Sequence, residues 1–462
     1  MRTTAAFRPD GSSHQHPSET TPLINGDGAP DHHQHDHFWR DVFINSKTTP
    51  GMDSHNPFVS WPVHVFNVIK ITLFSSYVNV LLVFVPLGIL AGVLEWGAAA
   101  VFTLNFFAII PLASILSFAT EEISVKLGET LGGLLNATFG NAVELIVSII
   151  ALQNDQIEVV KSSMLGSILS NLLLVLGMCF FLGGITNMTD ERGRGTEQIF
   201  ASGTAQTACS LMTLSTASMV IPATLAMVIE RGPNPGSAKE SILVLSRGTA
   251  IILLLLYVLY LYFQLRTHKN LFNPEVPDDE EEEENGEEDE ASMSAWSAAA
   301  VLIGVTLVIS ICADYLVDSI DAIVATGAIS KNFIGLILIP IVGNAAEHVT
   351  ACVVAVRNKM DLAMGVAVGS SVQIALLVTP FLVLLGWAMG KEMDLQFETF
   401  ETVSFFISVL VVTYTILDGK SNYLEGAMLF GLYVIIAVAF YAMPSDALDG
   451  PGAAVLSVLR LK

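Results

Sequence analysis

The chain has 462 residues, of which 52% are hydrophobic and only 14% are charged, whereas soluble domains carry about 25% charged residues. Its 21 basic and 44 acidic residues give a net charge of −23, and the basic residues do not cluster as a phosphate-binding surface requires. This composition excludes a water-soluble enzyme, a disulfide scaffold, a disordered protein and a nucleic-acid-binding protein. It predicts an all-α integral membrane protein.

Residues 1–58 predict a disordered cytosolic tail. The histidines between His32 and His37 have two interpretations, a metal-binding segment or a solvated tail, and we favour the tail because nothing fixes a ligand geometry. Residues 59–97 predict a helix along the membrane surface, followed by a first span. Its apolar residues recur at near-helical spacing at Phe58, Trp61, Val65 and Ile69.

Eleven stretches reach the roughly 20 apolar residues that a membrane-spanning helix needs. They fall near residues 75–96, 99–118, 132–152, 162–184, 199–222, 242–264, 296–316, 332–355, 362–387, 401–417 and 424–442. An odd number of spans places the two chain ends on opposite sides of the membrane. Arg2, Arg8, Arg40, Lys47 and Lys70 favour a cytosolic N-terminus, so residues 446–462 are predicted to be a lumenal tail.

The sequence matches itself at a constant offset of 203 residues. Gly140-Asn141-Ala142-Val143-Glu144 recurs as Gly343-Asn344-Ala345-Ala346-Glu347, and Gly166-Ser167 recurs as Gly369-Ser370. A pattern matched across two successive spans is a strong repeat signal. The copies lie five crossings apart and therefore run in opposite directions, as in the inverted repeats of many secondary transporters.

This repeat divides the membrane part into one span plus two sets of five. The first inverted repeat covers residues 98–265 and the second covers residues 296–445, with an acidic linker or helix at 266–295 between them. The linker has two interpretations, a flexible solvated segment or a cytosolic Ca²⁺-sensing segment, and dense like charge favours the first. Its eleven carboxylates are Asp278, Asp279, Glu280, Glu281, Glu282, Glu283, Glu284, Glu287, Glu288, Asp289 and Glu290.

Each repeat carries a glutamate in the middle of a span. Burying a carboxylate there costs about 2.5–3.5 kcal/mol, so Glu144 and Glu347 require an explanation. At about 100° per residue, Asn141 lies some 60° from Glu144 on one helical face, and Asn344 lies likewise beside Glu347. Both repeats thus present an amide oxygen beside a carboxylate.

We predict a cation site formed by these four side chains together with Gly140 and Gly343. The two glycines leave space for a close helix approach or for a helix break that frees carbonyl groups. An all-oxygen ligand set favours a hard divalent ion, and Ca²⁺ fits better than Mn²⁺ or Mg²⁺ because it accepts 6–8 oxygens in adaptable geometry. The alternative, two protonated glutamates bonded to a neighbouring helix, is less favoured because the motif is duplicated.

Further polar residues lie in and after the motif helices. Ser167 and Ser170 match Ser370 and Gln373 at the repeat offset, and the four could line the same cavity. For the serines a role as small packing residues is equally favoured, whereas Gln373 is too large for that alternative to be favoured. His348 shares a helical arc with Asn344 and Glu347, and we leave open whether it moves protons or only forms a hydrogen bond in the core.

Two nearby carboxylates repel one another, so either protons or a divalent cation must neutralise them. Two protonated glutamates and two glutamates holding one Ca²⁺ are both electrically neutral, so either loaded state can cross a low-dielectric environment. Protons and metal therefore compete for one site, which is the requirement for coupled exchange.

The segments GNAVELIVSIIAL with GSILSNLLLVLG, and GNAAEHVTACVVA with GSSVQIALLV, resemble the two signature repeats of the cation/proton exchanger family of calcium/cation antiporters. The resemblance covers residues 60–445 and is strongest to fungal vacuolar calcium/proton exchangers. It implies eleven spans, Ca²⁺ uptake into an acidic vacuole, a metal site on Glu144, Glu347, Asn141 and Asn344, and an acidic helix that contributes to Ca²⁺ sensing.

Taken together, we expect a vacuolar calcium/proton antiporter that works by alternating access. The alternatives are a sodium- or manganese-coupled exchanger of the same fold and, less favoured, a cation channel. We expect no enzymatic activity, since no HExxH motif is present, and no cofactor, with Ca²⁺ as transported substrate and, in the sensing alternative, as regulatory ligand. The expected partners are Ca²⁺, H⁺ and the lipid bilayer, with a homo-oligomer as an alternative to a monomer and no nucleic acid.

Overall fold

The computed structural model describes residues 57–189, 193–230, 238–272, 292–327 and 329–443. The predicted tail at 446–462 and all eleven carboxylates of the acidic segment lie outside these ranges. The predicted tail at 1–58 also lies outside them, except for Pro57 and Phe58, which begin helix α2. The residues up to His64 and those from Val65 onward form two separate compact units. Helix α2, Pro57–Phe74, crosses this boundary, and the other elements belong to the second unit.

Among the described residues, seven helical stretches are long and apolar enough to cross a membrane, or nine if each of two bent helix pairs counts as one span. The bent pairs are Ser60–Phe74 with Tyr77–Val93 and Lys331–Gly343 with Ala345–Val356. Two shorter apolar helices, Ala142–Gln153 and Thr399–Thr415, occupy the positions of the predicted third and tenth spans. The helical membrane fold is confirmed, and the count of eleven crossings stays a prediction.

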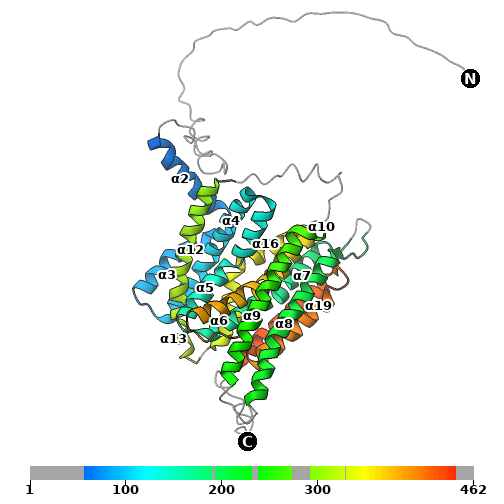
Figure 1. Ribbon diagram of the computed structural model, residues 1–462. Coiled ribbons are helices and arrows are strands. Elements are labelled where there is room, and N and C mark those ends of the chain that lie inside the picture. Colours follow the sequence, from blue (N-terminus) through cyan, green and yellow to red (C-terminus); the bar gives the residue numbers. More distant parts are fainter. Residues whose placement is uncertain (1–56, 190–192, 231–237, 273–291, 328, 444–462) are drawn as a thin grey trace, which may run out of the picture. The chain divides into compact units, whose positions relative to one another are not determined.

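The described residues in the first half of the second unit are mainly helical. In chain order these are the 3₁₀ segment η1 (Tyr77–Val83), α3 (Phe84–Val93), α4 (Ala98–Phe139), α5 (Ala142–Gln153), α6 (Ile157–Leu169), the π-helical η2 (Ser170–Val175), α7 (Leu176–Thr186), α8 (Ser202–Glu230), α9 (Ala238–Tyr262), the π-helical η4 (Phe263–Thr267) and α10 (Lys269–Phe272). Helices α8 and α9 lie side by side (Figure 1).

The second half follows the same plan. Its helices are α12 (Ala295–Asp318), α13 (Ile320–Val324), α14 (Lys331–Phe333), the π-helical η6 (Ile334–Leu338), α15 (Ile339–Gly343), α16 (Ala345–Val356), α17 (Met360–Gln373), the π-helical η7 (Ile374–Val378), α18 (Thr379–Ala388), α19 (Thr399–Thr415) and α20 (Tyr423–Ala442). Strands β1 (Gln198–Ile199) and β2 (Lys420–Ser421) pair antiparallel, with Gln198 opposite Ser421 and Ile199 opposite Lys420.

The helix boundaries recur at the predicted offset of 203 residues. Helices α5 and α16 begin and end at equivalent positions, and α6 and α17 begin at equivalent positions and run into π-helical segments. Asp155 and Asn358, which occupy equivalent turns, both adopt positive φ, 59° and 62°. The repeat seen in sequence is therefore also a repeat of local structure, and its inverted orientation in the membrane remains a prediction.

Breaks in the helices position the two motifs. Gly128 adopts φ 78° and ψ 170° and divides the long helix α4, a conformation that glycine tolerates because it has no Cβ. Asn141 (φ −102°, ψ 28°) separates α4 from α5, and Asn344 (φ −99°, ψ 5°) separates α15 from α16, where the chain bends by 59°. The sequence left open whether the motif glycines permit a close helix approach or a helix break. A helix break occurs in both repeats, one residue after the glycine.

Helix α2 confirms the helical spacing predicted around residue 65 and shows an unexpected orientation. Val65 and Ile69 are exposed, whereas Asn67 and Lys70 are only 4% exposed. The polar side of this helix therefore faces the protein and the apolar side faces outward, as expected beside lipid rather than water. The helix bends by 108° before the segment that corresponds to the first predicted span.

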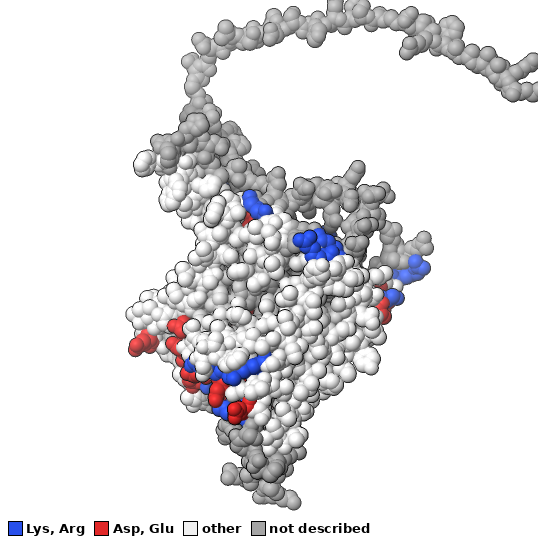
Figure 2. Space-filling view, viewed as in Figure 1, with Lys and Arg blue, Asp and Glu red and all other residues white. Residues whose placement is uncertain are grey.

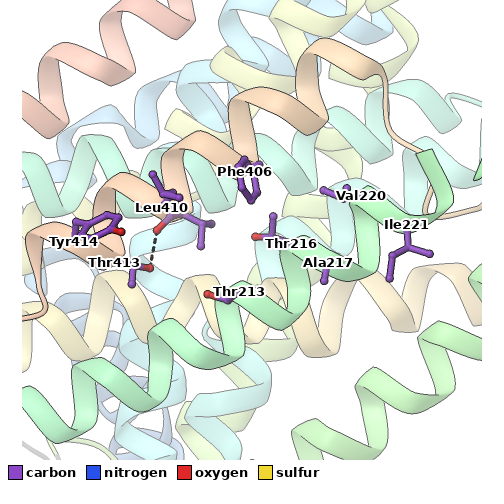
Figure 3. Close-up of a pocket in the computed structure, with 10 residues that line it drawn as sticks. Thr213, Thr216, Ala217, Val220, Ile221, Phe406, Leu410, Thr413 and Tyr414 are labelled. Atoms are coloured by element: carbon purple, nitrogen blue, oxygen red, sulfur yellow. Dashed lines mark hydrogen bonds between the residues drawn. The ribbon is translucent and has the colours of Figure 1, made fainter. Parts of the chain in front are cut away.

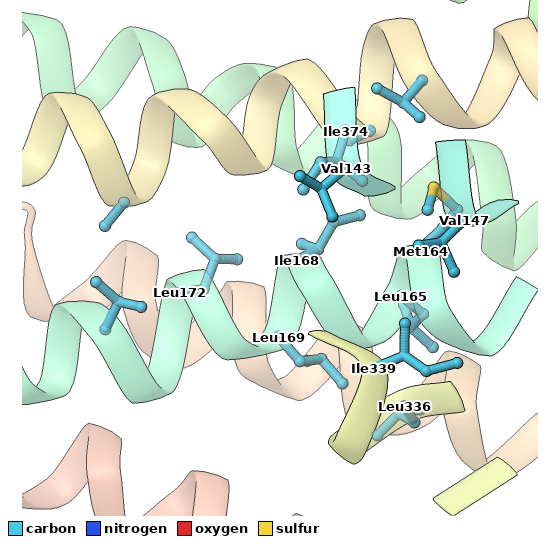
Figure 4. Close-up of a cluster of buried hydrophobic side chains, with 14 of the residues drawn as sticks. Val143, Val147, Met164, Leu165, Ile168, Leu169, Leu172, Leu336, Ile339 and Ile374 are labelled. Carbon is cyan, nitrogen blue, oxygen red and sulfur yellow. The ribbon is translucent and has the colours of Figure 1, made fainter. Parts of the chain in front are cut away.

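The core lies where the two repeats meet. Val143 on α5, Ile168 on α6 and Ile374 at the start of η7 pack together with residues of η6 and α15 (Figure 4). Gly166 lies directly against the backbone of Leu336, so only glycine fits there. Between helices in lipid, close packing of side chains stabilises the contact. Small residues such as glycine permit that close packing.

Charged side chains avoid the middle of the visible face. Figure 2 shows a broad band without charge, with acidic and basic atoms gathered mainly at the end of the bundle where α13 lies. Ion pairs there include Lys331 with Asp321 at 2.7 Å and Lys391 with Asp155 at 2.5 Å. A charge-free belt between polar ends is what a lipid bilayer selects.

Candidate cation site

Glu144 lies in the first turn of α5 and is 5% exposed. Its Oε1 atom has no hydrogen-bond partner among the described residues. A Cβ added to Gly343 would lie only 2.8 Å from this oxygen. The glycine of the second repeat therefore makes room for the carboxylate of the first, which is the close approach predicted from sequence.

Glu347 occupies the equivalent first turn of α16. Its carboxyl group lies near the Ser370 hydroxyl group and near Glu144, while its buried Oε2 has no partner among the described residues. Both carboxylates sit at helix N-termini, where the aligned backbone dipoles favour negative charge. The structure thus brings the two predicted acids together from opposite halves of the sequence.

The amide side chains are not equivalent, although the repeat predicts that they are. Ser370 donates a hydrogen bond to Asn141 Oδ1 (2.8 Å), and Asn141 Nδ2 donates to Gln373 Oε1 (2.7 Å). Asn344 is 1% exposed, and its Nδ2 has no partner in the described part of the chain. The two amides thus differ in their surroundings in this conformation, because the oxygen of Asn141 accepts a hydrogen bond from a hydroxyl group. Their role as matching ligands stays a prediction.

Asn171 belongs to the same network and was missed by sequence reasoning. Its Nδ2 donates to Ser370 Oγ at 3.0 Å, and its side chain is 1% exposed. The signal was present, because Asn171 is a carboxamide within an otherwise apolar run. It was overlooked because the equivalent position in the second repeat is Ile374, so the repeat comparison did not mark it.

The residues predicted to line a cavity divide into two groups. Ser370 and Gln373 line a polar cavity, whereas Ser167 and Ser170 do not line that cavity. Ser170 donates to the Ser167 carbonyl group at 3.1 Å and so satisfies its own helix, which favours the packing interpretation for that residue. His348 is 7% exposed and does not line the cavity, and its Nε2 has no partner among the described residues.

A polar cavity of 270 Å³ leads to Glu347. Thr350 and Gly365 at its edge are exposed, so the cavity is open to the outside. It lies toward the end of the bundle where α16 ends and α17 begins, and the buried Glu144 does not line it. The lining residues are Ser117, Thr120, Glu121, Asn136, Gly140, Glu347, Thr350, Gly365, Val366, Ser370 and Gln373.

Two neighbouring cavities differ in character. One of 380 Å³ lies between α17 and the ends of α8 and α9 and shares Gln373 with the polar cavity. Another of 450 Å³ lies between α8 and α19 and is lined by apolar side chains and threonines (Figure 3). Thr413 in that cavity donates to the Val409 carbonyl group at 2.7 Å, and no acidic residue lines it, so it offers nothing to a cation.

The donor set suits a hard cation. Two carboxylates and the side-chain oxygens of Asn141 and Ser370 lie near one another, without sulfur, which is the chemistry that Ca²⁺ prefers. No three His, Cys, Asp or Glu side chains gather anywhere in the described ranges, so a cation here would rely on two acids plus neutral oxygens or water. Such a site with few charges is expected to bind weakly and to release its ion readily.

Comparison with known proteins agrees with this architecture. The family described as sodium/calcium exchanger protein matches residues 97–266 and 297–442. The chain is 50% identical over 384 residues to the vacuolar calcium ion transporter of Schizosaccharomyces pombe, covering 83% of this chain and 89% of that protein. It is 42% identical over 370 residues to the Ca²⁺/H⁺ antiporter of Aphanothece halophytica, covering 79% of this chain and 96% of the relative.

A solved structure is also similar. Native YfkE superposes with a TM-score of 0.65 at 36% sequence identity, over 79% of this chain and all of the other. The residues matched by the family model include both motif helices and the helices that follow them. The chain therefore belongs to the sodium/calcium exchanger protein family, and within it to the cation/proton exchangers.

Proposed function

We propose that this protein is a vacuolar calcium/proton antiporter rather than an enzyme. The observation that carries the proposal is the pairing of Glu144 with Glu347 at two helix breaks, one repeat supplying each acid. The relatives support the ion and the membrane, since their names specify vacuolar calcium transport and Ca²⁺/H⁺ antiport. Cytosolic Ca²⁺ would enter the lumen as protons leave it.

Competition between the ions follows from charge. A bound Ca²⁺ holds both carboxylates ionised, and in its absence their mutual repulsion and burial favour protons. The unpartnered Oε1 of Glu144 and Oε2 of Glu347 are free to bind either ion. The empty site carries two buried negative charges. The free energy needed to change from the cytosol-facing to the lumen-facing state is therefore higher when the site is empty than when it holds Ca²⁺ or protons. This difference couples the flux of Ca²⁺ to the flux of protons.

Alternating access is proposed for the conformational step. The polar cavity reaches Glu347 from the end of the bundle at which α16 ends and α17 begins, and the predicted orientation assigns that end to the cytosol. Glu144 is closed off by Gly343 and the core around α5. We therefore assign the described conformation to the cytosol-facing state, with a multi-pass vacuolar location, a cytosolic N-terminus and a lumenal C-terminus.

The decisive experiment measures Ca²⁺ uptake into sealed vesicles that contain the purified protein and have an acidic interior. We expect Glu144→Gln and Glu347→Gln to abolish uptake, because an amide cannot supply the charge that a divalent ion requires. The exposed Glu240→Gln serves as a matched control and keeps the wild-type rate. Wild-type uptake in both motif variants would refute the assignment.

Two alternatives have their own readouts in the same vesicles. A channel would let Ca²⁺ equilibrate but could not concentrate it against its gradient when the interior is acidic. A sodium-coupled exchanger would respond to an imposed Na⁺ gradient in place of the pH gradient. Competition by Mn²⁺ for ⁴⁵Ca²⁺ uptake measures the selectivity between these two hard cations.

A further inference from the structure

Cys179 on α7 and Cys352 on α16 face each other across the two halves of the sequence. The two side chains are neighbours at the contact between α7 and α16, one helical turn from the point where Gly183 lies against Ala355. Cys179 is fully buried and Cys352 is half-buried, so a small reagent reaches Cys352 first. The contact joins α7, which follows the first motif, to the helix that carries Glu347.

The backbones of these helices approach closely at the same level. Helix α7 packs along α16, and a Cβ added to Gly183 would lie 3.0 Å from the carbonyl oxygen of Ala355. A disulfide requires Cα atoms within about 4.4–6.8 Å of each other. Gly183 and Ala355 follow Cys179 and Cys352 by about one helical turn, so the close approach of the backbones lies beside the cysteine pair.

The equivalent contact in the other repeat is built differently. The offset of 203 places Leu382 and Ile149 at the positions of the two cysteines. Helices α5 and α18 are separated by side chains, since a Cβ on Gly386 would meet Met393 at 2.7 Å and Leu152 at 3.8 Å. The thiol pair is therefore a feature of the α7–α16 contact alone and does not follow from the repeat.

We propose that Cys179 and Cys352 form a reversible disulfide that fixes α16 to α7 and stops transport. This inference rests on the proposed function, because it assumes that α16 moves against α7 when access changes. His348 lies four residues before Cys352 and so shares its helical face, and Glu347 precedes His348. A covalent bond at this face holds α16 in the position described here. It therefore prevents α16 from reaching the second position that alternating access requires.

The chemistry requires a two-electron oxidant, for which we name an azo compound such as diamide. The Cys352 thiol adds across the nitrogen–nitrogen double bond, with its proton passing to the second nitrogen. The Cys179 sulfur then attacks the Cys352 sulfur, forming the S–S bond and breaking the S–N bond. The two thiol protons and two electrons end on the hydrazine that is released.

The test treats vesicles containing the full chain with diamide and follows both covalent state and transport. We expect mass spectrometry of the digested protein to find the peptides of Cys179 and Cys352 linked. We expect Ca²⁺ uptake to fall at least about tenfold, because a bond of fixed length prevents the helices from separating, and dithiothreitol to restore it. Cys179→Ser, Cys352→Ser and their alanine counterparts should resist diamide.

Cys209→Ser and Cys312→Ser are matched controls, since both native residues are buried but neither belongs to the pair. These variants should remain as sensitive to diamide as the wild type. Absence of the linked peptide, a linked peptide without loss of uptake, or full inhibition of Cys352→Ser would each overturn the proposal. If untreated protein shows no proton-driven uptake, the proposed function fails separately, and the linked peptide still tests the thiol pair.

Discussion

Glu144 and Glu347 occupy equivalent positions on α5 and α16, two helices whose boundaries coincide at the repeat offset, yet their surroundings differ. Glu347 lines an open polar cavity of 270 Å³, whereas Glu144 is 5% exposed and packs against Gly343. Asn141 is held by two hydrogen bonds, and Asn344 has an unpartnered amide nitrogen in the described chain. A duplicated sequence has thus produced an asymmetric site, as expected if one conformation opens to one side of the membrane at a time.

The largest expected contrast concerns access along the two motif helices. Thr350 lines the cavity, and the repeat offset makes Val147, which is 5% exposed, its counterpart. With the native cysteines replaced by serine or alanine, we expect Thr350→Cys to react about 100-fold faster than Val147→Cys with a membrane-impermeant thiol reagent, because burial excludes both the reagent and the water that stabilises a thiolate. Mass spectrometry over time measures the rates. Equal rates would contradict the asymmetry.

The next contrast uses the glycine that accommodates Glu144. We expect Gly343→Ala to raise the KM for Ca²⁺ about tenfold or more, since the added Cβ would lie 2.8 Å from Oε1 and overpacking costs about 1–3 kcal/mol. Gly431→Ala on α20 is the control, because nothing lies within 4 Å of the position of its Cβ. Initial uptake rates at varied Ca²⁺ give both values, and an unchanged KM in Gly343→Ala would mean that Glu144 does not bind the ion.

A pH series on the cytosolic face sharpens the comparison between the acids. Protons and Ca²⁺ compete for the carboxylates, so lowering the pH on this face should raise the KM for Ca²⁺, and raising the pH should lower it. The rise is limited to about tenfold per pH unit when one proton is displaced and about a hundredfold when two are displaced. The slope of log KM against pH therefore counts the protons, and a KM independent of pH would exclude competition.

The smallest expected effect lies in the network around Asn141. Gln373→Leu removes the acceptor of the Asn141 amide, and we expect transport at low Ca²⁺ to fall about threefold to tenfold because a buried donor left unpaired costs about 1–3 kcal/mol. The offset counterpart, Ser170→Ala, should cost less, since Ser170 bonds only to its own helix. If Ser170→Ala has the larger effect, the network does not position the site.

Sequence reasoning succeeded where a local pattern has one physical explanation. Long apolar stretches predicted the helices, and the offset of 203 predicted that Glu144 and Glu347 are related. The cost of a carboxylate in an apolar span singled out these two acids without any tertiary information. The offset also anticipated that α16 and α17 repeat the boundaries of α5 and α6.

The failures have physical causes that a repeat cannot reveal. The offset left open whether Ser170 lines a cavity or serves in packing, and Gln373, its larger counterpart, is the one that lines the polar cavity. Asn171 was overlooked, since Ile374 is its counterpart. Hydrogen-bond partners such as Ser370 and Asn141 come from helices more than 200 residues apart, so no local pattern identifies them.

By itself the sequence determined the helical membrane class and the duplication, and it singled out the two acids as candidates, because hydropathy and charge cost depend on residue type and spacing alone. Only the tertiary structure decided that Gly343 faces Glu144, that Glu347 faces the cavity and that Cys179 meets Cys352. These contacts depend on how α5, α7, α16 and α17 pack, and packing is decided jointly by side chains distant in the chain.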